Sequence, residues 1–275
     1  MYPILFEFGP FIISSFGVMM VIAFLLGNYL LRRDVVALGY DPIIAEDITF
    51  RAAIGGILGA KVYYLIETIP TGQAADNING LIEIIAGIFT LSGGRIASGI
   101  QNFGAGLVFL GGLIGGVAAI SWYVYRKKLN WLEIADLAVP FLVLGHGIGR
   151  IGCFLVGDDY GIASNLPWAI AFPKGLPPTD ITVHPTQLYE MAAYFSIFFY
   201  LRYRKRNQQF KGEIMFEYLF LGGLARFMVE FIRTNTKYLF DLSGAQYLSI
   251  LMMGIGAYQM WKRRRINPIQ IQDAG

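Results

Sequence analysis

Two ionisable side chains stand one helical turn apart in an apolar, glycine-rich segment. They are His146 and Arg150, within residues 144–154, which also contain four glycines. Residues four apart share one face of a helix. An arginine near a helix end can simply anchor the helix at the membrane surface, but aliphatic and glycine surroundings are unusual for an anchor. Because a planar guanidinium matches the oxygens of a phosphate, Arg150 is a candidate for binding an anionic group.

A second charged stripe lies in another apolar segment. Arg226, Glu230 and Arg233 are spaced four and three residues apart, which places them on one helix face. Glu230 can neutralise one arginine and leave the other as a net cation, or the three can form a purely structural ladder of ion pairs. If Arg150 and Arg226 converge, they form a doubly cationic pocket, and an anionic lipid headgroup is the expected ligand.

Other polar side chains near these segments can move protons. Asp158 and Asp159 follow the first segment, and His184 opens residues 184–190. Pro185 suits the first turn of a helix, so His184 is expected at the membrane surface. A histidine in that position is more often structural than catalytic.

Glycines recur at a spacing of four in two further apolar segments. The pairs are Gly55 and Gly59, Gly111 and Gly115, and Gly112 and Gly116. This spacing favours close packing of helix backbones in a membrane. Approach of a lipid to the backbone of Gly111 and Gly112 is the secondary interpretation.

Seven apolar runs supply the elements that position these residues. A membrane helix needs about 20 apolar residues, and the second and fifth runs are short. The runs are residues 11–31, 52–66, 103–125, 137–156, 188–203, 214–232 and 246–260. We therefore predict an all-α integral membrane protein with seven transmembrane helices.

Basic clusters predict the orientation of these helices. Cytoplasmic loops are enriched in Lys and Arg, and clusters follow the first, third, fifth and seventh runs. They lie at residues 32–33, 126–128, 202–211 and 262–265. The pattern predicts an N-terminus outside the cell and a C-terminus in the cytoplasm.

Two long connections fall on the predicted outer side. Residues 67–102 include a moderately apolar stretch at 81–91, which is typical of an interfacial or partly inserted helix. Residues 157–186 contain five prolines, which indicates an irregular loop. We expect a single membrane domain, 1–275, with these two segments as a cap of loops and short helices and with 263–275 as a cytoplasmic tail.

Composition narrows the function classes. Hydrophobic residues make up 55% of the 275 residues and charged residues 15%, against about 25% in soluble domains; the mean hydropathy is +0.53. The net charge of +3 does not suggest a nucleic-acid partner. With one cysteine, no intramolecular disulfide forms, and two distant histidines make a poor metal site. No repeat of the kind found in transporters is evident.

Several motifs, in order along residues 8–262, resemble those of the bacterial prolipoprotein diacylglyceryl transferases. The matching residues are Phe8-Gly9-Pro10, 111–115, 149–154, 157–161, 184–190, Arg226 with 230–233, and Gln246 with Leu248-Ser249. The resemblance implies transfer of the diacylglyceryl group of phosphatidylglycerol to the lipobox cysteine thiol of a prolipoprotein, with release of glycerol phosphate. It also implies a multi-pass protein of the bacterial inner membrane, working near its outer face.

The resemblance assigns roles to individual positions. Arg150 and Arg226 match the arginines that bind phosphate, and Asp158 stands where the family has an acidic residue. The residues expected to bind substrate are Arg150, Arg226, Gly111, Gly112, Gly161, Glu230 and Arg233. The implied partners are phosphatidylglycerol, the lipobox segment and membrane lipid. No cofactor is implied, because the two substrates carry the reacting groups.

Four positions depart from the family pattern. Leu110 replaces a histidine, Cys153 an asparagine, Phe16 an aromatic hydroxyl and Gly222 a tyrosine. The candidates for the base that deprotonates the substrate thiol are therefore His146, His184 and Asp158. Alternatively, no base is needed, because the positive charge of the arginines lowers the pKa of the thiol.

Two other functions remain as alternatives. One is a divergent family member with another acceptor or lipid donor. The other is a non-enzymatic membrane protein that binds anionic lipid, or a small-molecule transporter.

Overall fold

The computed structural model describes residues 1–8, 11–104 and 106–266, and the chain divides into two units. The first unit comprises Met1–Pro42 and Asn130–Gly275, and the second comprises Ile43–Leu129. Gly9 and Pro10 of the opening motif lie outside the described residues, as do 267–275 of the predicted tail. Each unit is described by itself, and the single membrane domain stays a prediction.

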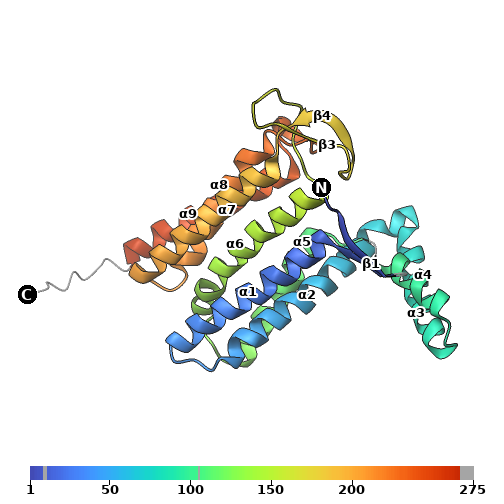
Figure 1. Ribbon diagram of the computed structural model, residues 1–275. Coiled ribbons are helices and arrows are strands. Elements are labelled where there is room, and N and C mark those ends of the chain that lie inside the picture. The colour runs from blue at the N-terminus through green and yellow to red at the C-terminus, as the bar shows by residue number, and fades with distance from the viewer. Residues whose placement is uncertain (9–10, 105, 267–275) are drawn as a thin grey trace, which may run out of the picture. The chain divides into compact units, whose positions relative to one another are not determined.

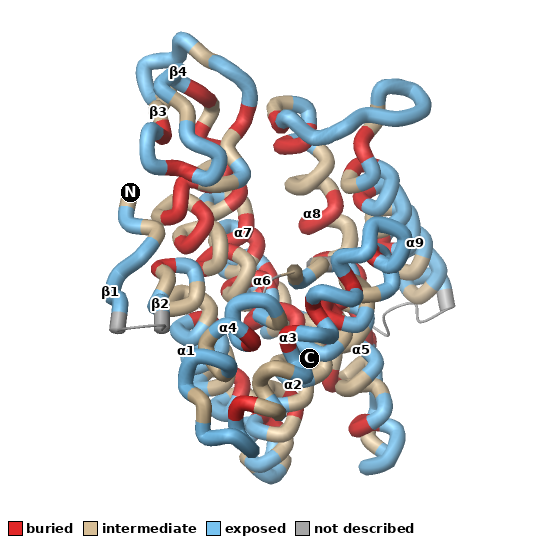
Figure 2. Tube along the Cα trace, turned by 90° about the vertical axis from the view of Figure 1, so that its right-hand side faces the viewer, coloured by how far each residue is buried: buried red, intermediate tan, exposed pale blue. Residues whose placement is uncertain are grey.

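Five α-helices make up most of the described part of the first unit. They are α1 (Ser15–Ala37), α6 (Trp131–Val156), α7 (Thr186–Arg204), α8 (Glu213–Glu230) and α9 (Gly244–Ile266). α6 packs against α1, α7 and α8, and α8 also packs against α7 and α9 (Figure 1). More than half of the apolar part of α6 is buried, against 17% for α1, so α6 is the central helix of the unit (Figure 2). Val143, Leu201 and Ile214 form its fully buried core.

A short hairpin precedes α1. Strand β1 (Ile4–Phe8) pairs antiparallel with β2 (Phe11–Ser14). The hydroxyl of Ser14 accepts a hydrogen bond from the backbone N–H of Gly17 at 3.0 Å, which caps the helix. The helix therefore begins four residues after the start of the predicted run 11–31.

The second unit is built on glycine contacts. It contains α2 (Ile43–Thr68), the short 3₁₀ helix η1 (Ile69–Thr71), α3 (Gln73–Phe89), α4 (Gly93–Gly104) and α5 (Phe109–Arg126). A Cβ atom on Gly59 would lie 2.3 Å from the carbonyl oxygen of Gly111, and one on Gly55 would lie 2.7 Å from that of Gly115. The expectation that these glycines let two helices pack closely is confirmed for α2 and α5.

Each of the seven predicted runs overlaps a helix, but the helices differ in their capacity to cross a membrane. Three stretches are long and apolar enough: Ser15–Ala37, Ile43–Thr71 and Trp131–Val156. The run 52–66 is short because it covers only part of α2, which has 26 residues. A largely helical membrane protein follows from these findings, whereas the full set of seven spans stays a prediction.

The two predicted cap segments have different structures. Residues 67–102 contain most of the antiparallel helix pair α3 and α4. Residues 157–186 instead contain strands β3 (Ile170–Phe172) and β4 (Thr179–Val183), which pair antiparallel beyond the ends of α6 and α8 (Figure 1). The irregular loop expected for the second segment therefore also contains a short hairpin, which β-branched residues around a proline-rich turn favour.

Charged side chains gather at one end of the first unit, where α1 and α7 finish. There, carboxylates of α1 and α8 bind basic residues that follow or end α7 and α9. Asp34 binds Arg202 and Lys205, and Glu213 binds Arg204 and Arg264. Two of the basic clusters used to predict orientation thus share one end of this unit.

Substitution of Gly59 by alanine is expected to destabilise the protein. The new methyl group would overlap the backbone of α5, and such overpacking costs about 1–3 kcal/mol. Thermal unfolding of the purified protein should show a lower midpoint for Gly59→Ala. Gly94→Ala is the matched control, since its Cβ meets open space in α4 and alanine favours a helix. Equal midpoints for the two variants would contradict the packing argument.

Candidate functional site

A buried carboxylate joins the two arginines that the sequence singled out. Glu190, in the second turn of α7, is 1% exposed. Its Oε2 lies 2.9 Å from Nε of Arg150, and its Oε1 lies 2.7 Å from Nη1 of Arg226. Nη1 of Arg233 lies 3.6 Å from Oε2. The expected convergence of Arg150 and Arg226 therefore occurs, through an acidic residue between them.

Two more carboxylates complete this arrangement. Asp159 binds Nη1 of Arg150 at 2.7 Å and Nη2 of Arg233 at 2.6 Å. Glu230 binds Nη2 of Arg226 at 2.8 Å. We call these six side chains the arginine cluster: Arg150, Arg226, Arg233, Glu190, Glu230 and Asp159. Their formal charges cancel, so the doubly cationic pocket expected from sequence is wrong for this structure, because Glu190 and Asp159 supply two negative charges that the expectation left out.

The helix directions bring these residues to one end of the first unit. α6 and α8 finish there with Arg150 and Arg226 in their last two turns, and α7 begins there with Glu190. Gly157 ends α6 with a φ of +79°, a left-handed conformation that glycine adopts readily. The chain then turns and places Asp159 against the guanidinium groups.

Backbone pairing holds the next part of this loop. The N–H of Gly161 donates to the carbonyl of His184 at 2.9 Å, and the N–H of Ile162 donates to the carbonyl of Ile232 at 2.9 Å. A Cβ atom on Gly161 would lie 2.4 Å from that Ile232 carbonyl. Glycine is thus required by the close approach of two backbone segments, and substrate binding by Gly161 stays a prediction.

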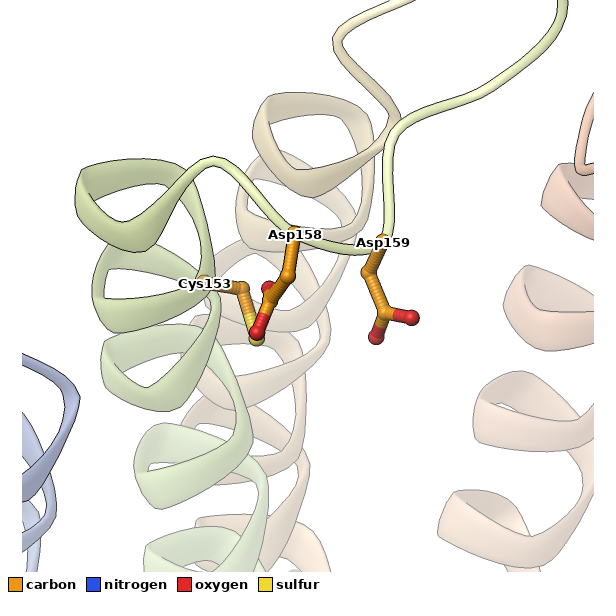
Figure 3. Close-up of side chains that lie close together, drawn as sticks. All are labelled: Cys153, Asp158 and Asp159. Carbon is orange, nitrogen blue, oxygen red and sulfur yellow. The ribbon is translucent and has the colours of Figure 1, made fainter. Parts of the chain in front are cut away.

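Asp158 and Asp159 point in different directions although they are adjacent. Figure 3 shows the Asp158 carboxylate directed toward the Cys153 sulfur and the Asp159 carboxylate directed away from it. Burial raises the pKa of Asp158 above its ordinary value, and a hydrogen bond with Cys153 offsets only part of this effect. Burial acts on Asp159 in the same direction, but Arg233 and Arg150 outweigh it and hold the pKa of Asp159 below its ordinary value.

These two carboxylates and Cys153 also have a composition that suits a metal ion. One ligand atom from each lies within 4.8 Å of the others. Both oxygens of Asp159, however, already bind guanidinium groups, and Nη1 of Arg150 lies 3.5 Å from the Cys153 sulfur. Because these positive charges repel a cation, we assign no metal to the group.

The two histidines lie in different surroundings. His146, one turn before Arg150, packs its ring against Tyr194 and Tyr218, with centroid distances of 5.4 and 6.4 Å. Nδ1 of His184 lies 3.3 Å from the hydroxyl of Tyr189, which also accepts a hydrogen bond from Trp168 at 2.7 Å. Neither contact joins a histidine to the arginine cluster.

Gly111 and Gly112 belong to the second unit. A Cβ on Gly111 would lie 2.3 Å from the Tyr63 Cβ, and one on Gly112 would lie 3.3 Å from the Gly56 carbonyl. The packing of α2 on α5 therefore accounts for Gly111, and a lipid contact at either glycine stays a prediction.

Sequence reasoning did not assign two residues of the cluster. Glu190 was quoted only within a motif, although an acidic residue near the start of an apolar run is itself a signal of function. Asp159 was noted beside Asp158, but its direction depends on its own φ of +59°. Residue type alone did not show which of the two aspartates binds the arginines.

Known proteins similar to this chain carry one description. A family model described as prolipoprotein diacylglyceryl transferase matches residues 3–262. A phosphatidylglycerol–prolipoprotein diacylglyceryl transferase of Clostridium tetani is 34% identical over 262 residues, covering 94% of this chain and 96% of that protein. One from Aeromonas salmonicida is 32% identical over 266 residues, covering 94% and 89%. A Clostridium perfringens protein of the same name, numbered 2, is 32% identical over 255 residues, covering 91% of each.

Replacement of Glu190 by glutamine is expected to destabilise the fold. The change leaves the buried guanidinium groups without their shared counter-charge, and breaking a buried ion pair costs about 3–5 kcal/mol. Thermal unfolding should show a much lower midpoint for Glu190→Gln than for Glu83→Gln. The control removes an exposed carboxylate whose pair with Arg95 lies at the surface. A Glu190→Gln midpoint equal to that of the wild type would refute the counter-charge role.

Proposed function

The chain belongs to the prolipoprotein diacylglyceryl transferase family, and we propose that it transfers the diacylglyceryl group of phosphatidylglycerol to the lipobox cysteine thiol of a prolipoprotein. Glycerol phosphate is the second product. The observation that carries this proposal is the convergence of Arg150 and Arg226, from two different helices, on one buried site. Guanidinium groups held in this way suit the phosphodiester of an anionic lipid.

The reaction is a substitution at carbon. The substrate thiol loses its proton, and the sulfur attacks the glycerol carbon that is bonded to the phosphate oxygen. A carbon–sulfur bond forms, the carbon–oxygen bond breaks, and its electron pair leaves with glycerol phosphate. The phosphate gains negative charge during this step, so cations fixed beside it lower the barrier.

In the proposal, Arg150 and Arg226 are the cations that stabilise the negative charge on the leaving phosphate. Arg150 and Arg226 are each about one-fifth exposed, so their donors border the surface while their counter-ion Glu190 is buried. Charge stabilisation is stronger at such a site than in water because the local dielectric constant is lower. Arg233 supplies a third donor to the phosphate, since its Nη2 lies in the same group of guanidinium donors as Nη1 of Arg150. Glu230 acts as a positioning residue that fixes the orientation of Arg226.

We assign the base to Asp158. Its Oδ1 is buried and has no hydrogen-bond partner among the described residues, so it can accept a proton. A carboxylate with a raised pKa is a better base near neutral pH than an ordinary one. Asp158 is preferred to His146 and His184 because its carboxylate is directed into the group formed with Cys153 and Asp159, next to Arg150 (Figure 3).

Both substrates must also be held in line for the attack. In the proposal, the backbone of Gly161 approaches the lipid or the lipobox segment. Contact of Gly111 or Gly112 with lipid is a separate expectation for the second unit. Support for Gly161 is its position in the chain, two residues after Asp159 of the cluster.

The same proposal includes the orientation in the bacterial inner membrane. The arginine cluster lies at the outer face, the N-terminus lies outside and the C-terminus is cytoplasmic. Support comes from the basic residues of α7 and α9, which gather at the end of the first unit opposite the cluster.

A family member with another acceptor or lipid donor is the remaining alternative. It would keep the arginines and change other positions of the family pattern, as Leu110 and Cys153 depart from that pattern here. The names shared by relatives that cover nearly the whole chain favour the first proposal over this one and over a non-enzymatic lipid-binding protein.

A transfer assay tests the proposed function. The purified protein, incubated with phosphatidylglycerol and a lipobox peptide, should release glycerol phosphate and increase the peptide mass by one diacylglyceryl group. Arg150→Ala should reduce the rate at least 100-fold, because it removes a donor to the leaving phosphate. Arg206→Ala, at an exposed position after α7, is the control and should keep the wild-type rate. Wild-type protein that is folded and inactive with these substrates would favour the alternative acceptor or donor.

The assignment of the base makes a separate prediction on pH. Asp158 must be ionised to accept a proton, so kcat/KM should fall as pH decreases through its raised pKa, which lies above 3.8. Asp158→Asn should lower the rate about 100-fold and remove this limb of the pH profile. His146→Phe keeps an aromatic ring between the two tyrosines and should retain the limb, as should His184→Gln. Loss of the limb in either histidine variant would reassign the base.

A further inference from the structure

We propose that the Asp159 carboxylate occupies, in the lipid-free protein, the position that the phosphodiester of the donor lipid takes when it binds. Asp159 is thus an internal competitor for the lipid headgroup, which sets the affinity of the site for anions. The inference rests on the proposed role of the arginines in binding phosphate.

The first support is the geometry of the contact. Asp159 presents one oxygen to Nη1 of Arg150 and the other to Nη2 of Arg233, at 2.7 and 2.6 Å. A phosphodiester also carries two anionic oxygens on one atom, and arginine pairs bind it in the same bridging way. The two groups therefore compete for the same donors.

The second support is the charge balance. The three arginines carry three positive charges, which Glu190, Glu230 and Asp159 cancel. If a phosphodiester with one negative charge bound while all three carboxylates stayed on the arginines, the site would carry a net negative charge. If it replaces Asp159 at the guanidinium groups, the balance is kept, because each anion carries one charge.

The third support is the difference in burial among the three carboxylates. The side chains of Glu190 and Glu230 are each 1% exposed and are held within α7 and α8. The side chain of Asp159 is 42% exposed and lies on a loop. Of the three, Asp159 alone can leave the arginines and gain water, so it is the anion that exchanges.

The backbone at Asp159 stays in place during this exchange. Its carbonyl accepts a hydrogen bond from the Thr186 hydroxyl at 2.6 Å, and the neighbouring Asp158 carbonyl accepts one from Gln187. Rotation of a single side chain is therefore sufficient to open the anion site. When the Asp159 side chain rotates back to the arginines, it helps to displace glycerol phosphate, which carries more negative charge than the phosphodiester of the lipid.

Direct binding measurements test this role. Isothermal titration of the detergent-purified chain with short-chain phosphatidylglycerol should give a dissociation constant roughly tenfold lower for Asp159→Asn than for wild type, because the competing charge is gone. Asp159→Ala should tighten binding in the same direction. Asp159→Glu, which restores the charge, should remain near the wild-type value. Asp180→Asn, which removes an exposed carboxylate on β4, is the matched control and should leave binding unchanged.

Glycerol phosphate should show the same order of affinities, because its phosphate competes for the same guanidinium donors. Unchanged or weaker binding of phosphatidylglycerol by folded Asp159→Asn and Asp159→Ala would overturn the competitor role, and would mean that Asp159 only orients the arginines. The readout is independent of transfer. A wild-type protein that transfers, with variants that bind no tighter, refutes this inference alone, whereas tighter binding without transfer refutes the proposed reaction alone.

Discussion

A guanidinium group held among apolar helices requires a carboxylate beside it, and Glu190 meets this requirement for two helices at once. Its two oxygens bind Arg150 of α6 and Arg226 of α8, so the ends of three helices are fixed relative to one another. Desolvation makes each of these charges costly alone. The position of the site therefore depends on one carboxylate, while apolar residues such as Val143, Leu201 and Ile214 pack the helices along their length.

Sequence reasoning predicted the helices well where apolar runs were long, and it predicted that Arg150 and Arg226 meet. It did not predict that Glu190 lies between them, because counter-ions on other helices follow from tertiary packing rather than from spacing along one helix. The hairpin of β3 and β4 was missed for a related reason: its strands are three and five residues long, too short for a clear periodic pattern. The start of α1 depended on a capping hydroxyl rather than on hydropathy.

A neutral cluster binds anions differently from a pocket with free positive charge. The sequence suggested addition of a headgroup to two unpaired cations, whereas the structure offers arginines that are already paired. An anion then enters by exchange, so affinity depends on how strongly the resident carboxylate is held. Such a site releases a charged product more readily than a site of high positive potential, which suits a reaction whose leaving group gains charge.

The backbone contacts at Gly161 have a consequence for how residues 157–186 can vary. Ile162 and His184 are joined by a backbone hydrogen bond of 3.0 Å, and Gly161 pairs with the same histidine, so the chain between them leaves and returns at one point. The hairpin also contacts the chain that leads into the arginine cluster: the N–H of Leu176 donates to the carbonyl of Gly157 at 3.0 Å, and the hydroxyl of Tyr160 donates to the carbonyl of Pro177 at 2.9 Å. A change in the hairpin at these contacts therefore moves the segment that carries Asp159, whereas a change in its length away from them leaves the charged groups in place.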